Sequence, residues 1–217
     1  YDFLAAGGGQ YIDGISVHVY SGRSPKRLWD QIRNWQDLIR SHGLSLPIWN
    51  TETNTACGGG PDSDRLLEQA SCAVMSAESA LAQSLLGQAA LGVQNVSLYT
   101  WEGAELDVGG VGLVESDFRT QTLAGLVVAR LGKLMRDSAV GWRHVDLTGL
   151  QMVEVAAADR VCKAMWAEAD TVHVPSDVRG VATWARQLDG RPVVQLDSGE
   201  WQVSTMPVVA CVGASGW

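Results

Sequence analysis

A single glutamate ends a short apolar run in the segment Leu46-Pro-Ile-Trp-Asn-Thr-Glu52. Such runs are typical of buried parallel strands, and α/β folds place catalytic side chains at the carboxyl ends of these strands. Hydroxyl and amide side chains beside Glu52 can hold its carboxylate in one orientation. We therefore expect Glu52 to be a nucleophile that attacks a sugar carbon, rather than a residue that caps a helix or forms an ion pair.

Two ring side chains with polar atoms, His18 and Tyr20, end the strand-like segment 11–20. Side chains two positions apart on a strand point to the same face, so the two rings should lie together. We expect Tyr20 to hydrogen bond to Glu52 and keep it ionised, while His18 contacts a sugar hydroxyl or the catalytic network. The alternative is an aromatic pair packed inside a barrel.

Three further residues are candidates for substrate binding. Trp101 offers a flat apolar face to a pyranose ring and an N–H group to one of its hydroxyls, with burial in the core as the alternative. Asn50 and Asn54 flank Glu52, and they either bind substrate hydroxyls or close hydrogen bonds of the loop. The tryptophans within helix or strand patterns are expected to pack in the core: Trp29, Trp35 and Trp49.

Strand-like and helical segments alternate through the first part of the chain. β-Branched and aromatic residues predict strands over 11–20, 46–51 and 95–101. Apolar spacing and capping residues predict helices over 24–43, from 62 or 63 to 90, and over 120–135. Three successive strand–helix units are typical of right-handed βαβ connections and predict a parallel sheet.

The pattern changes near Asp137, where short strand-like runs separated by turns begin. These runs cover 161–166, 171–174, 181–187, 193–196 and 201–205. Asp189-Gly190 and Ser198-Gly199 are typical of tight turns between paired strands. The sequence therefore predicts an α/β domain over 1–136 and a small antiparallel β domain of sandwich type over 137–217.

Composition disfavours several classes of partner. The net charge of −8 argues against nucleic acid and anionic membranes, because both bind clustered cations. No apolar run approaches the roughly 20 residues of a membrane span, which predicts a soluble protein. Neither metal-ligand spacing nor a phosphate-binding loop is present, so no cofactor is expected. The cysteines are expected to be buried free thiols, although each of two pairs could form a disulfide: Cys57 with Cys72, and Cys162 with Cys211.

Four segments in register resemble the retaining glycoside hydrolases of the (β/α)8-barrel clan, clan A, with its cellulase- and xylosidase-type families. Residues 13–20 look like the sixth strand of that clan. Residues 47–52 look like the seventh strand, whose terminal glutamate is the nucleophile. Residues 92–101 resemble the eighth strand, which often ends in a sugar-stacking tryptophan. The stretch from Leu188 to Val209 is similar to the β domain appended to several such families.

The resemblance implies hydrolysis of O-glycosidic bonds with retention, through a covalent intermediate on Glu52, with an oligo- or polysaccharide as substrate. A full barrel needs about 250 residues, and three of its strand–helix units are matched, so we expect the C-terminal portion of a longer enzyme. The acid/base glutamate of that clan ends the fourth strand, which an N-terminal part would supply. The chain alone is therefore expected to be inactive and poorly stable, and secretion is favoured as its destination.

Two other functions fit the same residues. A non-catalytic relic of a barrel would bind carbohydrate through Trp101 and the terminal domain. A different (β/α)8 enzyme would use Glu52 as a base that abstracts a proton, because a fold does not determine its chemistry.

Overall fold

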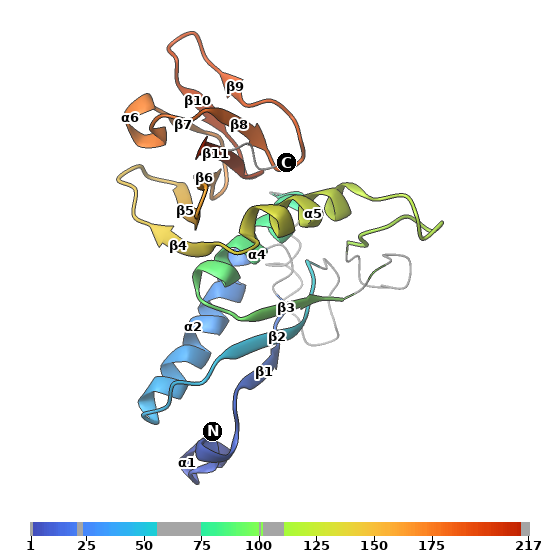
Figure 1. Ribbon diagram of the computed structural model, residues 1–217, viewed down its shortest axis with the longest axis vertical. Helices are drawn as coiled ribbons and strands as arrows, with labels where there is room; N and C mark the ends of the chain where they lie inside the picture. Colours follow the sequence, from blue (N-terminus) through green and yellow to red (C-terminus); the bar gives the residue numbers. More distant parts are fainter. Residues whose placement is uncertain (1, 21–23, 56–74, 100, 102–110, 214–217) are drawn as a thin grey trace.

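The computed structural model describes residues 2–20, 24–55, 75–99, 101 and 111–213. Helix α1 (Asp2–Ala5) lies at one end of the long axis, and the last antiparallel strands lie at the other (Figure 1). No helix within the described part of the chain is long and apolar enough to cross a membrane.

Three short strands form a parallel sheet with the second in the middle. They are β1 (Ile15–His18), β2 (Ile48–Thr53) and β3 (Asn95–Leu98). All three predicted strands are present. The first is shorter than predicted because Gly8–Tyr11 forms a 3-10 turn (η1). β1 and β3 are the edge strands of this sheet.

Helix α2 (Pro25–Ser41) confirms the helix predicted over 24–43. Buried apolar side chains recur along it at helical spacing: Leu28, Trp29, Ile32 and Ile39. Gly43, with φ 70°, follows the last turn in a left-handed conformation that suits glycine. The sequence predicts that the Ser24 hydroxyl caps this helix, which is wrong because that side chain makes no capping hydrogen bond. Pro25 opens the helix, as expected of a proline in the first turn.

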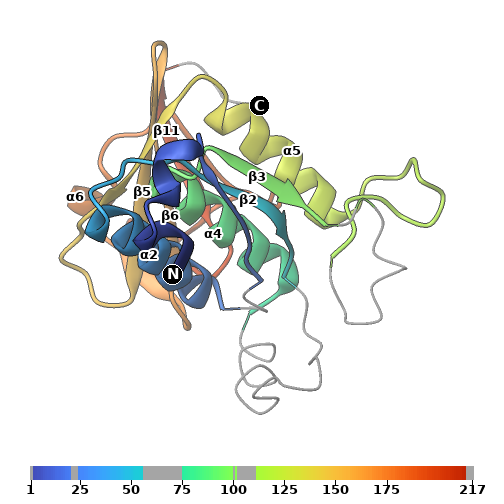
Figure 2. The same cartoon turned by 90° about the horizontal axis from the view of Figure 1, so that it is seen from below.

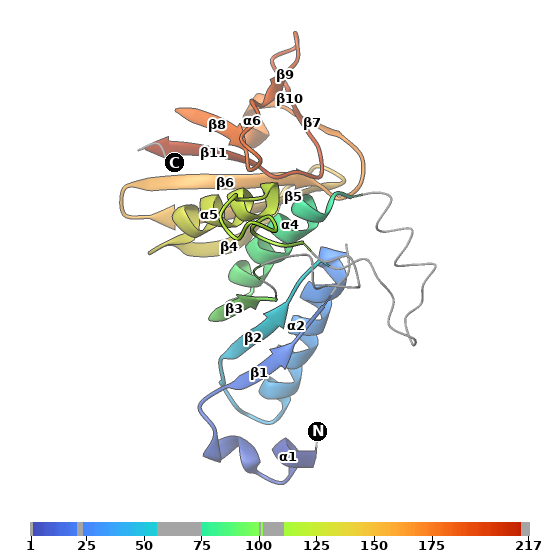
Figure 3. The same cartoon turned by 90° about the vertical axis from the view of Figure 1, so that its right-hand side faces the viewer.

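Helix α4 (Ala77–Ala90) is buried over most of its length. It lies between the parallel sheet and the antiparallel strands (Figure 3). The Ser76 hydroxyl accepts a hydrogen bond from the Ser79 N–H (3.1 Å), and the extended backbone of Ser76 makes Ala77 the first helical residue. The prediction of one continuous helix from 62 or 63 to 90 is therefore wrong at residues 75 and 76. Its predicted start lies outside the described residues.

Helix α5 (Leu123–Met135) largely confirms the helix predicted over 120–135. The Thr122 hydroxyl accepts a hydrogen bond from the Gly125 N–H (3.0 Å) and caps its first turn. The three long helices lie side by side, with α4 between α2 and α5 (Figure 2).

Antiparallel strands form two sheets after α5. The larger contains, in spatial order, β4 (Ala139–Arg143), β5 (Leu150–Ala157), β6 (Arg160–Ala167), β11 (Val208–Gly213) and β8 (Trp184–Gln187). The smaller contains β7 (Val172–Val174), β10 (Trp201–Val203) and β9 (Val194–Gln195), and the short helix α6 (Ser176–Arg179) follows β7. Each of the five predicted runs contains a strand. The sequence missed β4, β5 and β11. Alanine, glycine and polar residues weaken the strand propensity of β4 and β5, and pairing with neighbouring strands fixes the conformation of all three.

The larger sheet is buried on both faces. Val153 and Val155 belong to a hydrophobic cluster that includes residues of α2, α4 and α5. Met152 and Met165 belong to a second cluster, which includes Trp201 of the smaller sheet. The first cluster contains residues from both sides of position 137, so the α/β part and the antiparallel part share a core.

Three tryptophans join α2 to the larger sheet, which confirms the core role predicted for Trp29. The ring centroid of Trp29 lies 5.0 Å from that of Trp142 and 6.1 Å from that of Trp166. Gly87 of α4 permits this arrangement, because a Cβ atom there would lie 2.0 Å from Nε1 of Trp29. Trp35 is half-buried and packs against the same cluster.

A disulfide joins Cys162 of β6 to Cys211 of β11, which are paired positions of adjacent strands. The prediction of free thiols is therefore wrong for this pair, because strand register brings the two sulfur atoms together. Cys57 and Cys72 lie outside the described residues.

The two predicted turns have different outcomes. Ser198-Gly199 joins the paired strands β9 and β10, as predicted. Asp189-Gly190 also forms a tight turn, in which the Gln187 N–H donates to the Arg191 carbonyl (3.0 Å). However, β8 and β9 on its two sides belong to different sheets, so the predicted strand pairing across it is wrong.

Candidate active site

The pairing between β1 and β2 changes register beside Glu52. Val17 lies opposite Asn50, but the next residue, His18, lies opposite Glu52, so Thr51 is an extra residue on β2. Bulges redirect side chains and are common beside active sites. Here the bulge brings Glu52 to the face of β1 that carries His18.

The carboxylate of Glu52 contacts two side chains of this face. The Tyr20 hydroxyl donates a hydrogen bond to Oε1 of Glu52, and Nδ1 of His18 lies 3.3 Å from Oε2. The hydroxyls of Ser16 and Thr51 hydrogen bond to each other (2.6 Å) on the same face. The Glu52 side chain is 34% exposed, so a molecule in solution can reach it. The structure thus brings together Glu52, Tyr20 and His18.

Tyr20 is held as a hydrogen-bond donor. Burial raises the pKa of its hydroxyl above the usual range, and the hydrogen bond to Glu52 and the charge of that carboxylate raise the pKa further. Tyr99, which follows β3, adds to the same effect. The phenol of Tyr20 therefore stays protonated at neutral pH and donates to Glu52.

The backbone between His18 and Tyr20 is clamped by two side chains of β2. Oδ1 of Asn50 accepts a hydrogen bond from the Val19 N–H (3.2 Å), and the Thr53 hydroxyl donates to the Val19 carbonyl (2.7 Å). Both backbone polar groups of Val19 are thereby paired inside the protein. Because Val19 lies between the two residues that contact Glu52, this clamp orients both of them.

Asn50 and Asn54 have structural partners. Asn50 is fully buried, and its Nδ2 donates to Oε1 of Gln88 on α4 (2.7 Å). Asn54 is 2% exposed; its Oδ1 accepts hydrogen bonds from the N–H groups of Thr55 (2.6 Å) and Val111 (3.1 Å). The contacts of Asn54 match the loop-closing role that was one of the two roles expected for it, whereas those of Asn50 join β2 to α4 and to the backbone that follows β1.

Aromatic side chains lie exposed on or just after the parallel strands. Trp101, the predicted sugar platform, is 61% exposed. The prediction that Trp49 packs in the core is wrong, because Trp49 is 39% exposed and its Nε1 donates to Oε1 of Gln94 (3.4 Å). Tyr99 is also exposed, and sequence reasoning missed it although it follows a strand at the same edge as Glu52.

A cavity of about 350 Å³ lies between β1 and α2, next to the candidate site. His18 of β1 and the next residue, Val19, line it on one side, and Gln31, Asn34 and Trp35 are among the residues that line it from α2. His18 therefore borders this cavity and contacts Glu52. Among the residues that the structure describes, no group of His, Cys, Asp and Glu could hold a metal ion.

No protein-family model matches this chain, and no curated protein matches it in sequence. Solved structures do resemble its fold. The chain is similar to a GH30 endoxylanase from Clostridium papyrosolvens C71, with 10% identity and a TM-score of 0.53, covering 95% of this chain and 50% of that one. It is also similar to a β-porphyranase of glycoside hydrolase family 86 from Bacteroides plebeius, with 12% identity and a TM-score of 0.54, covering 99% of this chain and 43% of that one.

A conserved exported protein from Bacteroides fragilis is a third structure of this kind, with 10% identity and a TM-score of 0.53, covering 92% of this chain and 46% of that one. The chain thus spans about half the length of each of these proteins. At such low identity the likeness shows the fold alone, and that fold is a mixed α/β fold found in glycoside hydrolases.

Proposed function

We propose that this chain is the C-terminal part of a glycoside hydrolase that cleaves O-glycosidic bonds with retention, with Glu52 as the nucleophile. The observation that carries the proposal is the contact of an accessible Glu52 carboxylate with both Tyr20 and His18 at the carboxyl end of a parallel strand. In this proposal, β1, β2 and β3 are the sixth, seventh and eighth strands of a (β/α)8 barrel, and the fold likeness to glycoside hydrolases supports that assignment.

The reaction has two steps. A carboxylate oxygen of Glu52 attacks the anomeric carbon, the bond to the leaving oxygen breaks, and an acid protonates that oxygen. Water then attacks the anomeric carbon, and the ester bond to Glu52 breaks. The acid of the first step is a second carboxyl group, which is now ionised and takes a proton from the water. Tyr20 orients the attacking carboxylate through its hydrogen bond to Oε1 of Glu52, and Nδ1 of His18 lies 3.3 Å from Oε2.

Retention requires a second carboxyl group about 5–5.5 Å from Glu52. Among the described residues, the polar side-chain contacts of Glu52 come from Tyr20 and His18, and neither can supply that carboxyl group. We assign it to a glutamate on an N-terminal part of the same enzyme that completes the barrel. Trp101, exposed after β3, is the proposed stacking platform for a saccharide substrate.

The test uses the longest protein that the gene encodes. A 2-fluoro glycoside should inactivate it and label Glu52, and a label on any other residue would overturn the proposal. Glu52→Ala should lose turnover and regain it with azide, giving a glycosyl azide of inverted configuration. Glu115→Ala, which removes an exposed glutamate from a loop, is the matched control and should keep full activity.

A second function is favoured by the exposed aromatic side chains Trp49, Tyr99 and Trp101. A non-catalytic protein of this fold would bind glycans on them without hydrolysis. Glycan binding that is unchanged in Glu52→Ala, together with no hydrolysis by the longest protein, would identify this function instead.

A further inference from the structure

A cavity of about 460 Å³ between α5 and β8 is lined by three cationic side chains. Arg130 and Lys133 come from α5 and Arg186 from β8, while Gln121, Leu126 and Ala129 complete the lining. No carboxylate of the described residues lines it, although the chain has 24 Asp and Glu residues against 16 Lys and Arg. The local charge is therefore opposite in sign to that of the whole protein.

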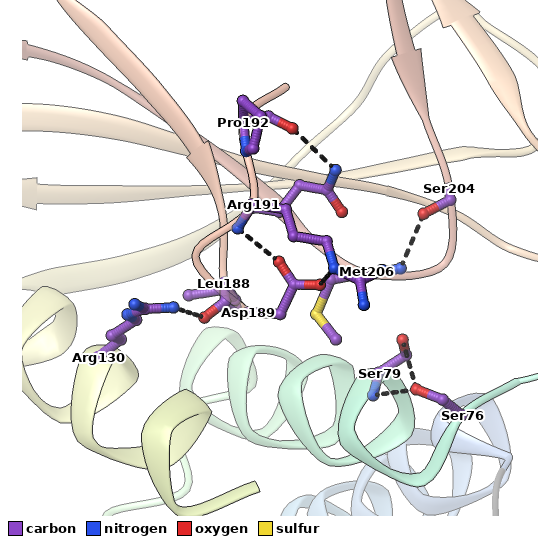
Figure 4. Close-up of polar contacts among 10 residues, drawn as sticks. Ser76, Ser79, Arg130, Leu188, Asp189, Arg191, Pro192, Ser204 and Met206 are labelled. Carbon is purple, nitrogen blue, oxygen red and sulfur yellow. Dashed lines mark hydrogen bonds and ion pairs between the residues drawn. The ribbon is translucent and has the colours of Figure 1, made fainter. Parts of the chain in front are cut away.

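The guanidinium of Arg130 is fixed by the main chain. Its Nη1 donates to the carbonyl of Leu188 (2.7 Å), as Figure 4 shows. Gly190 allows this position, because a Cβ atom there would lie 2.6 Å from the guanidinium nitrogens. A carbonyl orients the group without neutralising it, so Arg130 is a pre-oriented cation.

The three cations have no carboxylate partner among the described residues. The carboxylate of the adjacent turn, Asp189, is turned toward Arg191, whose Nε lies 3.4 Å from Oδ2 and whose N–H donates to Oδ1 (2.9 Å) (Figure 4). By contrast, Lys26 and Arg40 on α2 both pair with aspartates of their own helix. Lys133 also complements the dipole of the last turn of α5, but that role does not account for Arg186 on another element.

We propose that this cavity binds an oxyanion, the carboxylate or sulfate group of an acidic glycan. Guanidinium groups match the planar geometry of a carboxylate and also donate to sulfate oxygens, and a third cation adds attraction. Leu126 and Ala129 supply an apolar wall for a sugar ring, and Gln121 supplies an amide for its hydroxyls. The site shares no residue with the contacts of Glu52. The choice of a glycan as carrier rests on the proposed function, whereas oxyanion binding does not.

Isothermal titration calorimetry on the whole chain tests the proposal, with oligogalacturonate, a sulfated oligosaccharide, inorganic sulfate and a neutral xylo-oligosaccharide as probes. At least one acidic oligosaccharide should bind at low salt, more tightly than either inorganic sulfate or the neutral oligosaccharide. Its binding should weaken as salt rises, because salt screens exposed charges. Lys133→Gln with Arg186→Gln should weaken it about tenfold or more. Lys26→Gln with Arg40→Gln removes the same charge elsewhere and should leave it within about twofold.

Three results would overturn the proposal: no binding of any anionic probe, equal weakening in both double variants, or equal binding of the neutral oligosaccharide. If inorganic sulfate binds as tightly as every oligosaccharide, the ligand is a free anion. That result would overturn the claim that a glycan carries the oxyanion. Both cation pairs are exposed, and circular dichroism of the variants checks that they fold. Glu52→Ala should bind as the parent does. Failure of this inference is therefore distinguishable from failure of the proposed catalysis.

Discussion

Oδ1 of Asn50 accepts a hydrogen bond from the backbone N–H of Val19 (3.2 Å), at the point where the register between β1 and β2 changes. The Val19 N–H is thus paired with a side chain of β2 instead of with a backbone carbonyl of that strand. This hydrogen bond orients the backbone between His18 and Tyr20, the two residues that contact Glu52. The candidate site therefore depends on a residue that has no access to solvent.

Loss of the second hydrogen bond to the Val19 backbone, which the Thr53 hydroxyl donates, should reduce stability. Thr53→Val keeps the shape of the side chain but leaves the buried Val19 carbonyl without its 2.7 Å hydrogen bond. We expect the free energy of unfolding to fall by about 1–2 kcal/mol in urea denaturation. Ser16→Ala removes a hydrogen bond between part-exposed hydroxyls of the same sheet. It should change the free energy of unfolding by less than about 0.5 kcal/mol. Equal effects of the two substitutions would contradict the clamp.

Tyr20→Phe should change the alkaline pH dependence of stability. The pKa of Tyr20 is raised in the folded state, so its contribution is present below the usual tyrosine pKa of about 10 and is lost as pH rises through the folded value. The parent should therefore lose more stability above pH 10 than Tyr20→Phe, in urea denaturation at a series of pH values. Tyr11→Phe, at a residue that is 81% exposed, should follow the parent curve.

Under the proposed function, Trp101→Ala in the longest protein that the gene encodes should weaken saccharide binding by about tenfold, because the exposed ring proposed to stack on sugar is lost. The measurement is calorimetry with an oligosaccharide that the test of the proposed function identifies as a substrate. Phe118→Ala removes a comparably exposed ring, at 58%, and should leave affinity unchanged. Unaltered binding in Trp101→Ala would exclude the platform role.

Removal of the disulfide should destabilise the antiparallel part. Cys162 and Cys211 are separated by 49 positions, and in the chain-entropy model a loop of this length is worth about 4 kcal/mol. Cys162→Ala with Cys211→Ala should therefore unfold at lower urea concentration than the oxidised parent. A reducing agent should lower the midpoint of the parent more than that of the double variant.

Gly87→Ala should disrupt the packing that joins α2 to the larger sheet. A methyl group at this position would lie 2.0 Å from the indole nitrogen of Trp29. Helices α2 and α4, which carry the two residues, are packed too tightly to separate freely. We expect a loss of about 1–3 kcal/mol in stability and a reduced near-ultraviolet dichroism signal from the tryptophan cluster. Gly132→Ala, with open space around its Cβ position on α5, is the control and should stabilise slightly.

Much of the fold could be predicted from local patterns. The periodicity of α2 and the β-branched and aromatic residues around β1, β2 and β3 were sufficient to identify those elements, because each strongly favours one secondary structure. By contrast, β5 and β11 acquire their conformation from pairing with β6, which lies between them. The disulfide follows from the same register, since spacing along the chain says nothing about which strands are neighbours.

The site shows the same division. The sequence by itself determined that a carboxylate lies near the carboxyl end of β2 and that an imidazole and a phenol lie two positions apart at the end of β1 and just after it. Only the tertiary structure decided that these groups meet. Regular alternation along β2 from the buried Asn50 would turn Glu52 toward α4, on the face opposite His18. One extra residue, Thr51, reverses that direction, because a bulge shifts the register by one position and the side-chain period of a strand is two.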